Sequence, residues 1–160
     1  MIDRLAISQV VVLAAWLGAV LLVGTVVAPA AFATLPSRAL AGAVVGRVLP
    51  AIFLTGLAVG LFLVPGRLAG SAGLGRQIAG GVLVLSCAIS HLVVGARISA
   101  LRQAIEPSLD ALDPGDPRRV MFGRLHALSV AGLGIGVLAA VVALGLAIGA
   151  LQRRSGGAGA

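Results

Sequence analysis

Two histidines and one cysteine are the side chains of this sequence whose types and spacing could form a metal site. His91 lies about six residues before the end of one long apolar stretch, and His126 lies about seven residues after the start of the next. At about 1.5 Å per residue, antiparallel helices would place both histidines roughly 9–10 Å below the same membrane surface. Cys87 precedes His91 by four residues and shares its helical face. A Cys–His–His set can hold copper or zinc, and two histidines can bracket a haem.

Hydrogen bonding offers a simpler interpretation of the same histidines. Each imidazole can bond to a nearby serine, such as Ser90 or Ser129, or to a backbone carbonyl, and so support helix packing. Four phenylalanines and one tryptophan also provide little aromatic lining for a haem. We therefore expect no cofactor, with copper or haem binding through His91 and His126 as the alternative.

Three arginines are expected near the same membrane surface as the histidines. Arg47, Arg97 and Arg124 each lie close to the end of an apolar stretch. Arginines held close together repel one another unless an anion lies among them. Lipid phosphates can supply that anion, and so can acids such as Glu106 and Asp110. The predicted polar cluster therefore comprises Arg47, His91, Arg97, Arg124 and His126.

Glycines four residues apart form the third pattern. Such pairs lie on one face of a helix and let helix backbones approach closely in lipid, where no hydrophobic drive brings helices together. The last of three pairs lies deep in the final apolar stretch, beyond what packing within four helices requires. It therefore predicts a docking face for a partner subunit. The pairs are Gly56 and Gly60, Gly132 and Gly136, and Gly145 and Gly149.

Membrane-spanning helices must position these groups. Of the 160 residues, 59% are hydrophobic and 11% are charged, whereas a soluble domain usually has about 45–50% apolar residues. Four apolar stretches are long enough to cross a bilayer. We expect an all-α, four-transmembrane-helix bundle formed by one domain over residues 1–154, followed by a flexible tail over 155–160. The predicted spans are residues 5–28, 48–64, 77–97 and 119–151.

Prolines and charges predict where the spans end. We expect Pro29 and Pro36 to stop the first helix, because proline lacks an N–H and disfavours helix in the residue before it. Residues 30–47 are then expected to form a short interfacial segment between the first two helices. Pro50 is expected in the first turn of the second span, where proline is tolerated. The third helix is expected to continue as an amphipathic extension over 98–112.

Two function classes find no support in the sequence. No paired carboxylates lie in a span, and no serine or cysteine nucleophile is accompanied by a histidine and an acid in a recognisable order. We therefore expect no enzymatic activity. The net charge of +7 comes from twelve arginines spread among the loops, and only five aromatic residues are present. A nucleic-acid site would need a basic, aromatic-lined surface, so we expect no nucleic-acid partner.

Short motifs along residues 10–135 resemble the transmembrane protein 205-like family, a domain of unknown function. They resemble more distantly the membrane domain of copper-resistance protein D. The resemblance implies a four-helix membrane domain without an established activity, with His91, Arg97, Arg124 and His126 at family-like polar positions. The fourth span departs from the family pattern after Ser129, where glycine and alanine dominate. The motifs are Trp16-Leu17-Gly18, Ala28-Pro29 with Phe32 and Leu35, Gly42 and Gly46-Arg47 with Pro50, His91 with Arg97, and Phe122-Gly123-Arg124-Leu125-His126 with Ser129.

Together these patterns predict a non-catalytic integral membrane protein. We expect an accessory, helix-packing subunit that binds membrane lipids and protein partners in a larger membrane complex of the respiratory or photosynthetic type. Its expected location is the bacterial cytoplasmic (inner) membrane. Four spans place both termini on one side, and the loop after the third span carries four acids, as an exported loop often does. We therefore expect the termini in the cytoplasm.

Overall fold

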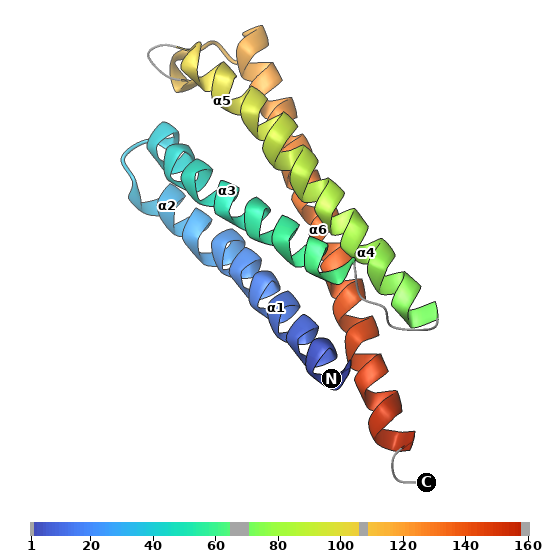
Figure 1. The fold of residues 1–160 in the computed structure, drawn as a ribbon. Coiled ribbons are helices and arrows are strands. Elements are labelled where there is room, and N and C mark those ends of the chain that lie inside the picture. The colour runs from blue at the N-terminus through green and yellow to red at the C-terminus, as the bar shows by residue number, and fades with distance from the viewer. Residues whose placement is uncertain (1, 65–70, 106–108, 158–160) are drawn as a thin grey trace.

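The computed structural model describes residues 2–64, 71–105 and 109–157, and this part of the chain is helical apart from short connections. It forms four long helical rods, as expected (Figure 1). α1 begins and α6 ends at the same end of the bundle (Figure 1). In chain order the elements are α1 (Ile2–Leu22), the π-helical η1 (Val23–Val27), α2 (Ala28–Thr34), α3 (Arg38–Leu63), α4 (Ser71–Ala88), the π-helical η2 (Ile89–Gly95), α5 (Ala96–Gln103), the 3-10 helix η3 (Leu109–Ala111) and α6 (Pro117–Gly157).

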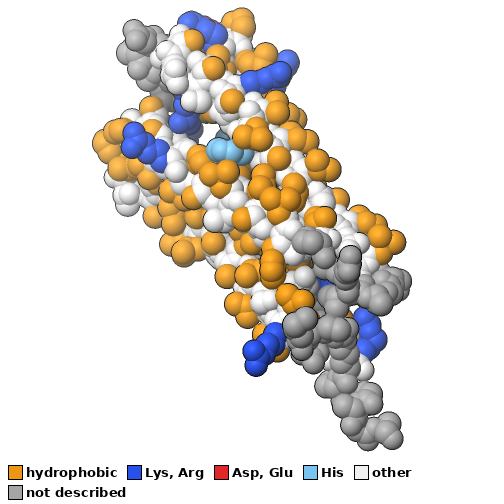
Figure 2. Space-filling view, viewed as in Figure 1, with side chains coloured by type: hydrophobic (Ala, Val, Ile, Leu, Met, Phe, Trp, Pro, Cys, Tyr) orange, Lys and Arg blue, Asp and Glu red, His pale blue; other side chains and the backbone are white. Residues whose placement is uncertain are grey.

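The rods are long and apolar enough to cross a membrane. Large hydrophobic side chains are exposed on all four of them, including Leu21, Leu54, Leu92 and Leu138. Figure 2 shows hydrophobic side chains over the middle of the molecule and arginines at its two ends, which is the distribution that a bilayer selects. The chain is therefore a multi-pass membrane protein. The candidate spans are Arg4–Thr34, Arg38–Leu63, Gly73–Gln103 and Pro117–Arg153.

The first rod continues past Pro29, where we expected it to stop. The backbone N–H of Ala28 donates to the carbonyl of Val23, five residues earlier, so the helix widens into a π-helical turn just before the proline. In an α-helix the proline ring clashes with the carbonyl four residues earlier, and the wider turn relieves that clash. The rod ends at Thr34, and Leu35 is extended (φ −82°, ψ 145°) as residues before a proline prefer.

The second rod begins ten residues earlier than expected. Ser37 is the N-cap of α3, and its side-chain oxygen accepts a hydrogen bond of 3.2 Å from the N–H of Leu40. Residues 38–47 are therefore helical, and the expected interfacial segment is absent because only residues 35–37 join the first two rods. Pro50 consequently lies in the interior of α3 and not in its first turn.

The third and fourth rods meet at a short capped loop. Of the amphipathic extension expected over residues 98–112, the described part is helical to Gln103 and again in η3, whereas residues 106–108 lie outside the described residues. Asp116 caps α6: its Oδ1 accepts from the N–H of Arg118 at 2.8 Å, and Oδ2 forms an ion pair with the guanidinium at 2.8 Å. The side-chain hydrogen bond from Arg118, followed by the backbone one, lowers the pKa of Asp116.

α6 runs to Gly157, so residues 155–157 of the expected tail are helical, because no proline interrupts them.

Small residues and one tryptophan form the centre of the bundle. Trp16 of α1 is 3% exposed, and its indole N–H donates to the carbonyl of Ile52 on α3 at 3.0 Å. Gly60 of α3 faces Gly80 of α4 so closely that a Cβ added at Gly80 would lie 3.0 Å from the carbonyl oxygen of Gly60. Close backbone approach thus fixes the α3–α4 pair. The core side chains around these contacts include Leu13, Phe53, Leu63, Leu83, Cys87, Ala140 and Ala143.

Candidate functional site

His91 lies in η2, a π-helical segment within the third rod. π-helical turns are rare and often occur at functional sites. The His91 side chain is half-buried, whereas its neighbour Ser90 is buried against Gly132 of α6. Ser90 therefore makes a close contact between the third and fourth rods.

His126 is exposed on α6, where its ring stacks on Phe122. The two ring centroids are 6.3 Å apart and the planes differ by 3°. Cys87 is fully buried, and a Cβ added at Gly56 would lie 2.7 Å from its Sγ. Within the described residues, no three His, Cys, Asp or Glu side chains lie close enough to hold a metal ion. The structure does not gather Cys87, His91 and His126 into a metal centre, because the thiol points into the α1–α3 packing and His126 faces outward.

The three arginines of the predicted polar cluster all have exposed side chains. Arg47 lies on α3, Arg97 on α5 and Arg124 on α6. Among described side chains the ion pair is that of Arg118 with Asp116, so these three guanidiniums form no ion pair with a described carboxylate. The expected partners Glu106 and Asp110 have side chains outside the described part of the chain.

Arg102 of α5 is the polar residue that joins different rods at this end, and sequence reasoning did not single it out. Its Nη1 donates to the carbonyl of Gly42 on α3 at 3.1 Å. Its guanidinium carbon also lies 5.2 Å from the centroid of the Phe122 ring on α6, a cation–π contact. The glycine pair Gly42 and Gly46, four residues apart, was the available indication that something approaches this face of α3.

Two buried polar side chains at the other end were also missed. Arg76 is 2% exposed and belongs to α4, although the expected third span began one residue after it. Gln9 of α1 is 3% exposed, and its Oε1 accepts no hydrogen bond from the described residues. The apolar run that begins at Ile78, two residues after Arg76, could have indicated that the helix begins before Arg76.

The three glycine pairs have different surroundings. Gly56 and Gly60 pack against α1 and α4, and Gly132 and Gly136 pack against Ser90 and Ser86 of the third rod. A Cβ added at Gly145 would meet no described atom within 4 Å, and one at Gly149 would approach only Arg153 of its own helix. The first two pairs therefore serve packing within the bundle, and the third faces away from it.

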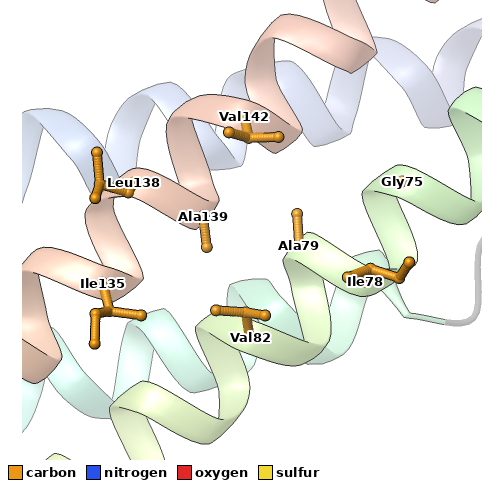
Figure 3. A pocket seen from close by; sticks show the side chains of 8 residues that line it. All are labelled: Gly75, Ile78, Ala79, Val82, Ile135, Leu138, Ala139 and Val142. Atoms are coloured by element: carbon orange, nitrogen blue, oxygen red, sulfur yellow. The ribbon is translucent and has the colours of Figure 1, made fainter.

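A shallow apolar groove of about 320 Å³ lies between α4 and α6. Figure 3 shows its side chains converging from the two helices. Because no polar group lines it, the groove offers nothing for acid–base or metal chemistry and suits an acyl chain or an apolar side chain. Its lining residues are Gly75, Ile78, Ala79, Val82, Ile135, Leu138, Ala139 and Val142.

Comparison with known proteins finds one family. A family model described as "Domain of unknown function (DUF4149)" matches residues 11–107, which is more than half of the chain. No curated protein and no solved structure matches. The matched part contains Arg47, His91, Arg97 and Arg102, whereas His126 lies beyond it.

Proposed function

Because this chain belongs to the DUF4149 family, whose function is unknown, we propose a role from its surfaces. It is a non-catalytic accessory subunit that docks a transmembrane helix of a larger membrane complex, of the respiratory or photosynthetic type, against α6. Lipids that bind at the two ends of the protein hold it at its depth in the bilayer.

The outward glycine face of α6 carries this proposal. Gly123, Gly134 and Gly145 follow one another at intervals of eleven residues, which is about three helical turns, so they lie on one face. All three are exposed, and a Cβ added at any of them would meet no described atom within 4 Å. Glycine in a helix interior is about 1 kcal/mol less favourable than alanine. Packing inside the bundle does not account for these glycines, and close approach of a partner helix does.

The surroundings of this face suit a helix as its partner. Leu138 is 68% exposed and lies both between the glycines and at the edge of the α4–α6 groove, so a partner side chain can enter that groove. α6 has 41 residues, about 60 Å at 1.5 Å per residue, whereas the hydrocarbon core is about 30 Å thick. Its end extends beyond the starts of α1 and α4 (Figure 1).

Substitution of the outward glycines tests the docking role. Gly134→Leu and Gly145→Leu should fold, because both sites are open, yet should release the chain from its native complex. A leucine in a close helix contact should weaken docking by about tenfold or more. Blue-native electrophoresis of mildly solubilised membranes from the native host measures the ratio of complexed to free chain.

Gly18→Leu is the matched control, because Gly18 is also exposed with no described atom near its Cβ but lies on α1. This variant should remain in the complex. An unchanged complex with both α6 variants would contradict the proposal. So would a purified wild-type dimer that the same variants dissociate, because the partner would then be a second copy.

Location and orientation belong to the same proposal. We place the protein in the bacterial inner membrane with cytoplasmic termini, because the loop between α5 and α6 carries the acids. An alkaline phosphatase domain, active only outside the cytoplasm, should be inactive after Ala160 and active when inserted at Gly115. The reverse pattern would invert the topology.

We also propose that the chain is related to the transmembrane protein 205-like family and, more distantly, to copper-resistance protein D. The support for this relationship is the set of short motifs around Trp16, Arg47 and His126.

A further inference from the structure

The bundle opens at the end that carries the α5–α6 connection. There α2 and α3 diverge from α5 and the start of α6 (Figure 1). Figure 2 shows a hollow between these two helix pairs, with arginine and histidine side chains at its rim. The third candidate span ends at Gln103, on this side of the bundle. Lipid headgroups flank the hydrocarbon core where spans end, so we place the hollow near the lipid phosphates.

One guanidinium crosses this hollow. Arg102 reaches from α5 to the carbonyl of Gly42 on α3, while the ring of Phe122 on α6 lies against it. The approach to α3 depends on glycine: a Cβ at Gly42 would lie 3.1 Å from Nη2, and one at Gly46 would lie 3.3 Å from Nη1. The His126 ring continues the aromatic wall beyond Phe122. Contacts with α3 and α6 therefore orient the guanidinium that α5 carries.

Most N–H donors of the Arg102 guanidinium have no hydrogen-bond acceptor among the described residues. A guanidinium has five N–H donors, and among the described residues the Gly42 carbonyl accepts one hydrogen bond from Arg102. Arg102 is exposed, and the described ion pair at this end is the one between Arg118 and Asp116. The neighbouring arginines on α3, α5 and α6 add positive potential without filling the site. A guanidinium fork oriented in this way, with donors that no described residue occupies, matches the geometry of a phosphate.

We propose that the hollow between α3 and α5 is a phosphate site in which Arg102 binds the headgroup phosphate of an anionic phospholipid. Gly42 and Gly46 form its floor, and Phe122 forms its wall. This proposal names the lipid class of the proposed function and rests on its lipid-binding part, not on docking by α6. The docking test can therefore fail while this one succeeds, and the reverse.

Lipid retention by the full-length protein provides the test. The protein is released from nanodiscs of mixed phosphatidylglycerol and phosphatidylcholine, and native mass spectrometry measures which lipids it retains. Arg102→Gln should lower the ratio of retained phosphatidylglycerol to phosphatidylcholine about tenfold, which corresponds to losing one charge-assisted hydrogen-bonded contact. Arg102→Lys should lower it less, because lysine keeps the charge and loses the fork. Gly42→Ala should also lower it, since the added methyl group displaces the guanidinium without removing a charge.

Arg38→Gln is the matched control, because Arg38 is exposed at the same end and its loss removes the same charge. Its retention ratio should stay within about twofold of wild type, since exposed charges act weakly at a distance. An equal loss with Arg38→Gln and Arg102→Gln, or wild-type retention with both Gly42→Ala and Arg102→Lys, would overturn the site. Inorganic phosphate is added to lipid-free protein as a second arm. An Arg102-dependent adduct there, with lipid retention independent of Arg102, would assign the site to soluble phosphate.

Discussion

Gly80→Ala is expected to destabilise the folded bundle by about 1–3 kcal/mol, whereas Gly81→Ala, one residue later, should leave it unchanged or slightly more stable. A methyl group at Gly80 would lie 2.8 Å from the Cβ of Leu63 and 3.0 Å from the carbonyl oxygen of Gly60. Neither atom can move without moving the α3 backbone, so the two helices must separate. At Gly81 the same methyl group meets no described atom within 4 Å.

The two variants differ in position and not in chemistry, so each controls for the other. Unfolding in mixed micelles of increasing sodium dodecyl sulfate content can be followed by the fluorescence of Trp16, the one tryptophan of the chain. Gly60→Ala should destabilise as Gly80→Ala does, because it meets Val84 and Gly80 across the same contact. The variant with both Gly60→Ala and Gly80→Ala should lose less free energy of unfolding than the two single variants lose together, because helices that are already separated accommodate the second methyl group. Equal midpoints for Gly80→Ala and Gly81→Ala would contradict this account of the interface.

The number and type of the rods could be predicted from hydropathy because the bilayer imposes both. Backbone N–H and C=O groups have no water to bond with in lipid, so long apolar stretches must be helices. Their ends were less predictable. Pro29 is accommodated by the π-helical η1, and Pro50 lies within α3. Both depend on hydrogen-bond register inside a long helix, which the bilayer does not dictate.

The predicted polar cluster shows what sequence position alone can and cannot establish. Depth along a helix follows from residue count, but the count depends on where the helix ends: the third rod continues to Gln103, so His91 lies twelve residues and Arg97 six residues before its end. The direction in which a side chain points depends on how its rod is rotated about its own axis relative to the neighbouring rods. A sequence pattern does not contain that rotation. Arg102 is sixty residues from Gly42 in sequence, so their contact could not be read from local spacing.

Glycine position separates the two roles that we assign to the bundle. Where a Cβ would collide with another rod, as at Gly60, the glycine holds the bundle together. Where it would meet no described atom, as at Gly145, the glycine is available to a neighbour. The sequence motif is the same in both cases, and only the packing distinguishes a structural glycine from a docking one.

Trp16→Ala is expected to destabilise the bundle by about 3–5 kcal/mol, the usual cost of truncating a buried aromatic side chain and leaving a cavity. Trp16 enters the centre from α1 and reaches two other rods: atoms of its ring would lie 2.8 Å from a Cβ at Gly56 and 3.8 Å from one at Gly136. Packing, and not the hydrophobic effect, holds helices together in lipid. Loss of this ring should therefore loosen α1 from both α3 and α6.

Trp16→Phe separates the ring's volume from its hydrogen bond to Ile52. Interhelical hydrogen bonds in membranes contribute about 0.6 kcal/mol on average. The loss of unfolding free energy in Trp16→Phe should therefore be smaller than that in Trp16→Ala by at least about 2 kcal/mol. Circular dichroism must follow the unfolding, because these variants lack the fluorescent residue. Phe32→Ala is the control: Phe32 is 51% exposed on α2, and its truncation should change stability by less than about 0.5 kcal/mol. If Trp16→Ala were no more destabilising than Phe32→Ala, the ring would not be the packing link between α1 and the rest of the bundle.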